Sequence, residues 1–279
     1  MELNHIAARD ARLSAILKED MKISTGLMNR LKWQDLLFVN GTPVHTDHPV
    51  KAGDLVTVPL DEPEPEYPAQ EGELHILYED AHLLAVDKPA GMLINPSRSR
   101  FDGTLANFVL GYYRKTGQKS AFHPVTRLDR DTFGIVLLCK NSHAHALMQN
   151  TRLEKTYHAL VLGRWEEAEG IIDAPIARRP LPSLLREVRA DGKPSLTRFR
   201  VLERFAGYTK LALQPVTGRT HQLRVHCAHL GHPILGDPQY GGDSFGQPHQ
   251  ILCAKELRFD HPVTGNPMIL TSSMDAVLL

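Results

Sequence analysis

The segment HPVTRLDRDTFGIVLLCKN, residues 123–141, constrains the fold of this chain more than any other stretch. Its second half contains the apolar run GIVLLC, which is typical of a buried β-strand. Its first half places Asp129 two residues after Arg127 and directly before Arg130. A surface loop does not need the apolar run, and a core strand does not need the charges. The segment therefore predicts an acidic side chain at the mouth of a buried strand, and a simple strand-terminal salt bridge is the alternative.

A proline- and glutamate-rich segment, DEPEPEYPAQEGE at residues 61–73, divides the chain. Proline and charge repulsion both stiffen such a segment, so it predicts an extended linker. The 279 residues are enough for two domains, because domains commonly contain about 100–200 residues. We therefore expect a small domain at residues 1–60, a linker at 61–73 and a larger domain at 74–279.

The segment before the linker has the pattern of a compact α+β module. The apolar residues of LMNRL, 27–31, keep helical spacing, and Ser24 or Thr25 is placed to cap that helix. The Asn40-Gly41 pair lies between apolar residues, which is a strong hairpin signal. Two short helices followed by a small sheet are expected here.

Strands that are adjacent in sequence dominate the larger domain. We predict helices at 103–117 and 142–154, and strands at 75–89 (with a turn at Glu79-Asp80), 155–163, 197–205 and 208–216. Because strands follow one another more often than they alternate with helices, a largely antiparallel α+β core is favoured over a doubly wound sheet.

The charge distribution points to an anionic ligand. The net charge is zero, but residues 1–68 hold 7 Lys and Arg against 11 Asp and Glu, and residues 69–279 hold 25 against 21. Basic residues gather at 98–130, with seven against two acids, and at 178–204, with eight against three. Two basic clusters in a neutral protein suggest an anion such as nucleic acid, and solvated surface is the alternative.

The sequence favours a cytoplasmic protein. No apolar run reaches the roughly 20 residues that span a bilayer. The start, MELNHIAARDARLS, is charged throughout and lacks the apolar segment of a signal peptide. Cys139, Cys227 and Cys253 have no paired spacing, which favours reduced thiols over disulfides. We expect no membrane partner, and a monomer is the default.

Two further motifs carry polar side chains in ordered positions. EKTYHALVLG, 154–163, places Lys155 and Tyr157 on one face of a strand. VTGRTHQLRVHCAHLGHPILGDPQYGG, 216–242, holds several within eleven residues: Arg219, His221, Gln222, Arg224, His226 and His229. If 221–230 is a helix, His221 and Arg224 share one face and Gln222 and His226 share another.

The histidine spacing fits no common metal motif, and no cysteine pair accompanies it. Neither a glycine-rich phosphate loop nor a G-x-S-x-G motif occurs in the sequence. We therefore expect chemistry without a metal, a nucleotide cofactor or a serine nucleophile.

Taken together, TRLDRDTFG, KTYHALV, TGRTHQLRVH and GHPILGDPQYG, in that order, resemble the motifs of the RluA-type RNA pseudouridine synthases. DKPAGMLINP and ILCAKELRF fit the same pattern, so the resemblance extends from about residue 74 to the C-terminus. It implies an α+β pseudouridine synthase core with a largely antiparallel mixed sheet, acting on ribosomal or transfer RNA without a cofactor. Residues 1–60 resemble the small RNA-binding domain, first known from a ribosomal protein, that often precedes this core.

The resemblance also implies roles for individual residues. Asp129 is the expected catalytic acid, and Arg224 the buried guanidinium that keeps it ionised in a water-poor cavity. Tyr157 is an expected active-site residue, and Arg127 the arginine that enters the RNA helix where the base is extruded. The remaining substrate-binding candidates are Thr132, Lys155, Arg219, His221 and Gln222.

The signature departs from the family pattern at two positions. Thr126 stands where the family has histidine, and Phe133 stands where it has serine. These departures keep a second hypothesis open, a non-catalytic RNA-binding protein of the same fold that acts in ribosome assembly. A hydrolase that uses aspartate and histidine is a third.

Overall fold

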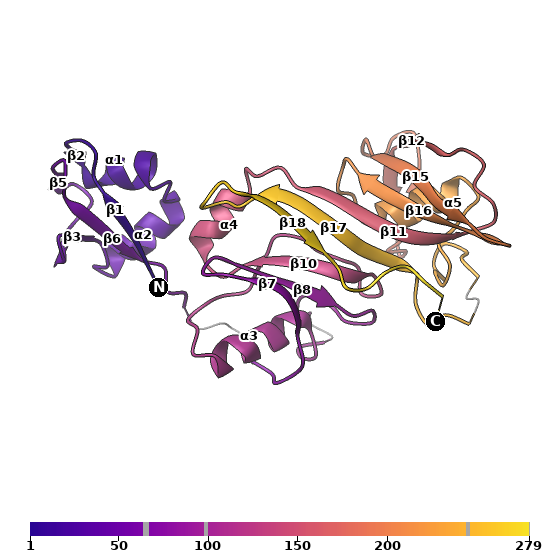
Figure 1. Cartoon of the computed structure of the whole chain (residues 1–279), viewed down its shortest axis with the longest axis horizontal. Coiled ribbons are helices and arrows are strands. Elements are labelled where there is room, and N and C mark those ends of the chain that lie inside the picture. Colours follow the sequence, from indigo (N-terminus) through magenta and orange to yellow (C-terminus); the bar gives the residue numbers. More distant parts are fainter. Residues whose placement is uncertain (64–66, 98–99, 244–245, 279) are drawn as a thin grey trace.

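The computed structural model describes residues 1–63, 67–97, 100–243 and 246–278 (Figure 1). A small unit at the N-terminus stands beside a much larger one built around a long twisted sheet (Figure 1). The α+β class predicted from the sequence is confirmed.

The N-terminal unit has its own sheet and its own apolar core. The sheet has the order β1 (Glu2–Ile6), β6 (Leu55–Pro59), β3 (Phe38–Val39), β4 (Thr42–Pro43), and β2 (Ala11–Arg12) pairs separately with β5 (Pro49–Val50). Its helical segments are α1 (Leu13–Ala15), a π-helical turn at Ile16–Asp20, and α2 (Thr25–Trp33). The Ser24 hydroxyl accepts a hydrogen bond from Leu27 N at 3.2 Å, so the predicted cap is confirmed.

The segment after this unit is largely exposed, but the Glu62 side chain within it is packed against the two units. The Glu62 side chain is 4% exposed; its carboxylate accepts from Arg30 Nη1 at 3.0 Å and from Ser142 N at 2.6 Å. Burial would raise the pKa of Glu62, but hydrogen bonds from His123, Arg30 and Ser142 outweigh it and lower the pKa to about 2. Residues 64–66 of the predicted linker lie outside the described residues.

In the described residues, ten strands form the large sheet. The main path is β12 (Glu169–Asp173), β15 (Leu196–Arg204), β16 (Tyr208–Pro215), β11 (Glu154–Leu162), β17 (Leu252–Asp260), β10 (Phe133–Cys139), β8 (Leu83–Lys88), β7 (His75–Glu79). β18 (Pro267–Thr271) pairs with β17, and β9 (His123–Pro124) pairs with β10. Within the described ranges only β10 and β17 run parallel, so the mixed, largely antiparallel sheet is as predicted.

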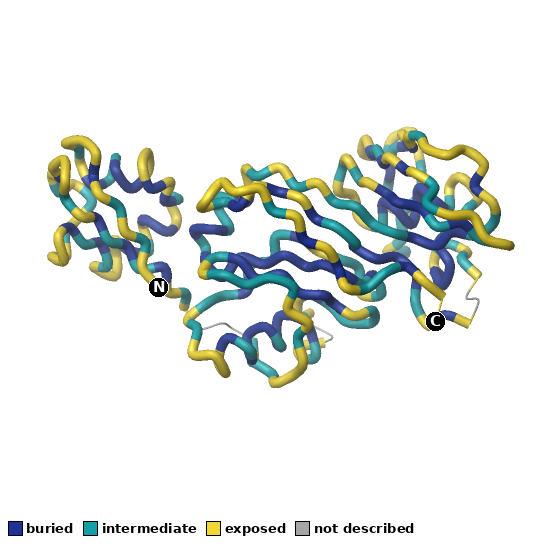
Figure 2. Tube along the Cα trace, viewed as in Figure 1, coloured by how far each residue is buried: buried dark blue, intermediate teal, exposed yellow. Residues whose placement is uncertain are grey.

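The apolar run GIVLLC is a buried strand, as predicted. Every residue of Gly134–Cys139 is buried, as is every residue of neighbouring β8, and the tube is dark blue there (Figure 2). Helix α3 (Leu105–Lys115) packs on one face of these strands, and α4 (Ser142–Met148) packs on the other. The run is therefore interior because helices cover both sides.

Helix α5 (Gln222–His229) covers β11, β15 and β16, and it lies beside a short hairpin, β13 (Ile176–Arg178) and β14 (Arg186–Val188). The helix predicted at 142–154 is shorter than expected. It ends at Met148, because residues from Glu154 pair as a strand with both β16 and β17. Tertiary pairing has overridden local pattern there.

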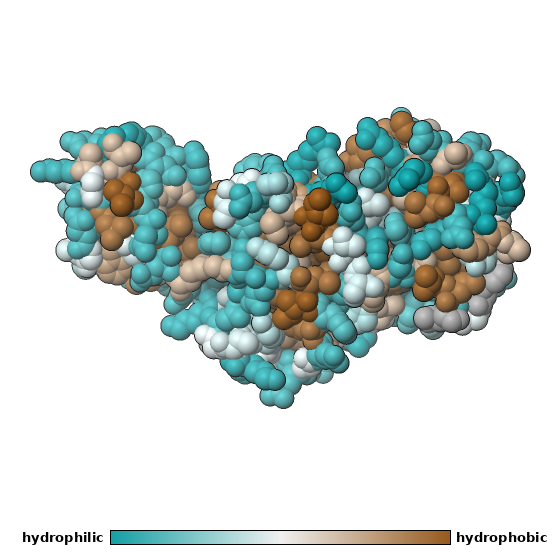
Figure 3. All heavy atoms as spheres, viewed as in Figure 1, coloured by the Kyte–Doolittle hydropathy of each residue, from teal (hydrophilic) through white to brown (hydrophobic). Residues whose placement is uncertain are grey.

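The visible surface is mostly hydrophilic, with separate apolar patches over the small unit and the sheet (Figure 3). Within the described part of the chain, no helix has the length and apolarity needed to cross a membrane.

Candidate active site

A cavity of about 620 Å³ opens where the loop before β10, the start of β11 and the start of α5 meet. It is the place where three predicted motifs converge from distant parts of the sequence. All nine predicted site residues line it: Arg127, Asp129, Thr132, Lys155, Tyr157, Arg219, His221, Gln222 and Arg224.

The loop 127–132 is fixed at both ends, and this fixes Asp129. On its N-terminal side the buried Thr126 hydroxyl accepts from Leu137 N at 2.9 Å. On its C-terminal side Gln250 Nε2 donates to the Thr132 hydroxyl at 2.7 Å. Thr132 thus borders the cavity, but its oxygen is engaged in holding the loop.

Neither departure from the family signature lines the cavity. Thr126 closes the turn between β9 and β10 through its hydroxyl. Phe133 packs in an apolar cluster with Leu160, Leu235 and Cys253. Both side chains therefore support the loop that carries Asp129 and do not contact a molecule bound in the cavity.

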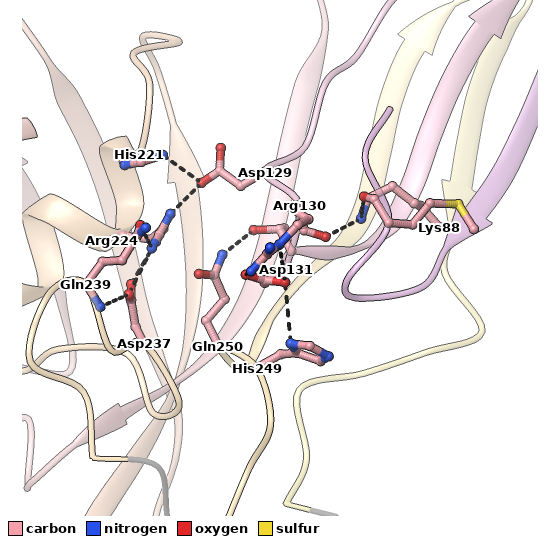
Figure 4. A network of polar contacts seen from close by, with 12 residues as sticks. Lys88, Asp129, Arg130, Asp131, His221, Arg224, Asp237, Gln239, His249 and Gln250 are labelled. Atoms are coloured by element: carbon pink, nitrogen blue, oxygen red, sulfur yellow. Dashed lines mark hydrogen bonds and ion pairs between the residues drawn. The ribbon is translucent and has the colours of Figure 1, made fainter. Parts of the chain in front are cut away.

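Lys88 supports the same loop from below. Its side chain is fully buried, and its ammonium donates to three carbonyls, those of Pro89, Met92 and Arg130, at 2.8–2.9 Å. Burial lowers the pKa of Lys88 to about 8, against the nearby carboxylates of Asp131 and Asp129. DKPAGML is thus tied to the loop that follows Asp129 (Figure 4).

The central contact of the cavity joins Asp129 to Arg224. Arg224 Nη1 donates to Asp129 Oδ2 at 3.0 Å across 95 positions of sequence (Figure 4). The Arg224 side chain is 5% exposed, and that of Asp129 is 31% exposed and faces the cavity. The carboxylate of Asp129 is therefore held next to a fixed positive charge while it still faces the cavity.

Arg224 is itself held by a second, fully buried carboxylate. Its Nε donates to Asp237 Oδ2 at 2.7 Å and its Nη2 to Asp237 Oδ1 at 2.8 Å, in a bidentate pair. Nη2 also donates to Gln239 Oε1 at 2.7 Å. Burial works to lower the pKa of Arg224, but Asp237 and Asp129 outweigh it and raise it, so the guanidinium stays charged.

The turn that precedes Asp237 requires glycine at position 236. Gly236 has φ +73°, and a Cβ there would come 2.1 Å from His249 O. No other residue type fits that approach, so Gly236 allows Asp237 to point at Arg224.

Gln222 anchors the loop that precedes α5. Its Oε1 accepts from the Thr217 hydroxyl at 2.8 Å and from Arg219 N at 3.0 Å. Its Nε2 donates to Leu196 O and the Thr197 hydroxyl, both at 3.0 Å. The amide is fully engaged, which suits a supporting role better than contact with a ligand.

His221 lies at the mouth of the cavity with its backbone in the left-handed region, φ +56°. Its Nδ1 is 2.8 Å from the Tyr240 hydroxyl, and its Nε2 is 3.8 Å from Asp129 Oδ2. Burial lowers the pKa of His221, Asp129 acts to raise it, and Arg224 lowers it further. The imidazole is therefore mainly neutral at neutral pH.

Lys155 and Tyr157 lie on the cavity face of β11, as predicted. Neither side chain has a hydrogen-bond partner among the described residues, so both are free to meet a ligand. Burial lowers the pKa of Lys155. Burial, and secondarily Asp129, raises the pKa of Tyr157, which therefore keeps its proton.

The arginines next to Asp129 in sequence do not pair with it. Arg127 is exposed at the rim of the cavity, and Arg130 donates instead to the Asp131 carboxylate at 3.0 and 3.1 Å. Arg219, also at the rim, donates to Pro194 O at 3.2 Å. The partner of the acid comes from a distant helix.

The basic cluster at 178–204 does not form one surface. Arg178 and Arg186 belong to the hairpin beside α5, whereas Arg198 and Arg200 line a second concavity with Thr156 and His158. Because side chains alternate along a strand, Thr156 and His158 point away from the face that carries Lys155 and Tyr157. The cluster at 98–130 is likewise dispersed, and its residues 98 and 99 lie outside the described residues.

Several residues of the site were missed or given no role from the sequence. Asp237, Tyr240 and Lys88 were noted only as members of the motifs GHPILGDPQYG and DKPAGMLINP, and Gln239 and Gln250 were not singled out. The signal that could have found Asp237 is the Gly-Asp-Pro run next to a buried helix with a charged residue. Across the described residues, no group of three or more His, Cys, Asp or Glu side chains is arranged to hold a metal.

The arrangement can perform chemistry at a sugar carbon. An ionised carboxylate in a partly dry cavity can attack or stabilise a developing sugar cation, as in glycoside hydrolysis. Lys155 and Tyr157, which have no hydrogen-bond partner among the described residues, line the same cavity, and Arg127 is exposed at its rim. A planar base on a sugar fits such a cavity.

Comparison with known proteins gives consistent matches. The sequence profile described as RNA pseudouridylate synthase matches residues 82–229. An uncharacterized RNA pseudouridine synthase of Bacillus subtilis is 40% identical over 238 residues, covering 83% of this chain and 84% of that protein. The ribosomal large subunit pseudouridine synthase D of Pseudomonas aeruginosa is 38% identical over 248 residues, covering 82% and 77%. The solved structure of human RNA pseudouridylate synthase domain containing 1 has a TM-score of 0.59 at 30% identity, covering 76% of this chain and 87% of that one.

Proposed function

This chain belongs to the RNA pseudouridylate synthase family and is an RNA-modifying isomerase, and on that premise we propose that it converts uridines of ribosomal RNA with Asp129 as the reacting carboxylate. The observation that carries the assignment of the residue is the 3.0 Å contact between Asp129 and Arg224 inside the cavity. The relative from Pseudomonas aeruginosa, whose name specifies the large ribosomal subunit, favours ribosomal over transfer RNA.

The reaction detaches uracil from its ribose and reattaches it through carbon. Negative charge develops on the base and positive character on the sugar as the glycosidic bond breaks. Asp129, which accepts from Arg224 Nη1 at 3.0 Å, meets that positive character as nucleophile or as stabiliser. Tyr157, which keeps its proton, lines the same cavity and contacts the base or the sugar.

A uridine within a helix must leave its stack before it reaches Asp129. Extrusion costs a few kcal/mol. Arg127 is exposed at the rim and has no partner among the described residues, so it is free to occupy the vacated position in the RNA. Arg219, also at the rim, and Lys155, inside the cavity, are cations placed for phosphates next to the target, contacts that position RNA without reading its sequence.

Other residues of the predicted set support the site. We assign Thr132 and Gln222 to holding the two loops that frame the cavity, because their polar atoms are already engaged there. We propose that residues 74–279 are the catalytic domain and residues 1–60 an accessory RNA-binding module. A cytoplasmic monomer that uses no cofactor remains our expectation from the sequence.

Mapping pseudouridines in ribosomal and transfer RNA tests the proposed substrate. RNA from a deletion strain should lack pseudouridine at one or more ribosomal positions, and the wild-type gene should restore them while Asp129→Asn does not. Loss confined to transfer RNA would overturn the ribosomal assignment. Tight RNA binding with an unchanged pseudouridine map would favour the non-catalytic assembly factor instead.

A further inference from the structure

His221 is held in one tautomer by a chain of hydrogen bonds from outside the cavity. Arg186 N, a group that can only donate, donates to the Tyr240 hydroxyl at 2.9 Å. The Tyr240 oxygen is therefore an acceptor there, and the acceptor available for its own proton is His221 Nδ1 at 2.8 Å. Since a neutral imidazole carries one proton, that proton is on Nε2.

The protonated nitrogen faces the reacting group. His221 Nε2 lies 3.8 Å from Asp129 Oδ2, too far for a hydrogen bond but near enough to share a substrate with it. The His221 side chain is 17% exposed and sits on a non-glycine residue at φ +56°. Strained backbone of this kind persists where the surrounding structure imposes it, and it is common at functional sites.

The surroundings of His221 favour a neutral ring. Asp129 and Asp237 are the neighbouring carboxylates, and Arg224 and Arg186 are the neighbouring cations, so the two signs are balanced. Burial then disfavours the imidazolium. Arg224 also lies over the Tyr240 ring, 5.0 Å from its centroid, which keeps the tyrosine under the histidine.

We propose that neutral His221 is a catalytic residue that donates Nε2–H to oxygen O2 of uracil as the glycosidic bond breaks, and that Tyr240 is the positioning residue that fixes its tautomer. This inference rests on the proposed function. The bond from the sugar carbon to the ring nitrogen breaks, and its electron pair delocalises over the ring and its oxygens. O2 is bonded to the carbon next to that nitrogen, so it takes up part of the charge that the broken bond leaves on the ring.

A neutral donor suits this reaction better than an imidazolium. The detached uracil must stay anionic in order to form the new bond through carbon, and an imidazolium would transfer its proton to the oxygen. A neutral imidazole stabilises the charge by a hydrogen bond and keeps its proton, as the neutral histidine of triosephosphate isomerase does. No proton is transferred to or from His221 in the step.

Two substitutions at His221 separate the donor role from a structural one. In His221→Gln the amide reaches the Nε2 position and can donate, but contact with Tyr240 is lost. In His221→Asn the amide oxygen reaches the Nδ1 position and keeps Tyr240, but no donor remains at Nε2. Removing one such donor typically lowers kcat about 10²–10³-fold. We expect that loss of kcat in His221→Asn and a loss of kcat within about tenfold in His221→Gln. RNA affinity should stay close to wild type in both variants. The control is His229→Asn, because His229 is exposed on the same helix, and its kcat should match wild type.

The tautomer can be read without activity, by ¹⁵N NMR of histidine-labelled protein. Wild type should show His221 protonated at Nε2 only, and Tyr240→Phe should show a tautomer mixture and a lower kcat. A wild-type signal protonated at Nδ1, or an activity order in which His221→Asn equals or exceeds His221→Gln, would overturn the inference while leaving the proposed function intact. A wild-type protein inactive on ribosomal RNA would overturn the proposed function, and this inference with it.

Discussion

Replacing Asp237 by asparagine should destabilise the protein, because Asp237 is the fully buried partner of Arg224. The substitution keeps the shape of the side chain but removes the charge and one of the two acceptors at 2.7 and 2.8 Å. Removing one member of a buried pair costs about 3–5 kcal/mol. Asp129 and Gln239 still contact the guanidinium, so we expect the lower end, about 3 kcal/mol.

The assay is thermal unfolding followed by circular dichroism. In a unit of this size 1 kcal/mol shifts Tm by about 2–4 °C, so Asp237→Asn should melt about 6–12 °C lower than wild type. Asp191→Asn removes an ion pair whose aspartate is 70% exposed, and it should melt with wild type. If Asp237→Asn melted within about 1 °C of wild type, the view that Asp237 holds Arg224 in place would be refuted.

Three further perturbations test other parts of the structure. The pKa of Glu62 is lowered from 4.5 to about 2, so the stability that its charge contributes is full above pH 4.5 and is lost as pH falls towards 2. The Tm difference between wild type and Glu62→Gln should therefore be constant from neutral pH down to about pH 4.5 and shrink below it. A Tm difference that does not change with pH would contradict this. Gly236→Ala would place a Cβ 2.1 Å from His249 O, so it should lower both Tm and kcat, whereas Gly26→Ala, with open space around its Cβ, should lower neither. Burial raises the pKa of the free thiols of Cys139, Cys227 and Cys253 to about 12. Iodoacetamide should therefore label none of them in the native protein and all of them after denaturation, and rapid labelling of the native protein would contradict this.

Local patterns predicted local structure well. The Ser24 cap and the buried run Gly134–Cys139 follow from residue types and spacing alone. The spacing of 216–242 placed His221 and Arg224 on one side of a helix, and the structure has both within 3.8 Å of Asp129, although the helix itself begins at Gln222. Each of these depends on neighbours in sequence or on one periodic element.

Features that depend on contacts between distant segments were harder to predict. The composition of 61–73 indicates a free linker, yet Glu62 is buried because Arg30 and Ser142 happen to meet it in space. The basic residues of 178–204 gather in sequence, but alternation along β15 turns Arg198 and Arg200 to the opposite face from the cavity. The role of Asp237 appears only once the loop folds back over α5.

Release of tritium from RNA labelled at carbon 5 of uracil is the most direct test of the central claim, that Asp129 performs the isomerisation. Wild type should release label to water with each turnover. Asp129→Asn, with Tm and RNA affinity close to wild type, should release none above background. Release at the wild-type rate by the folded variant would contradict the account.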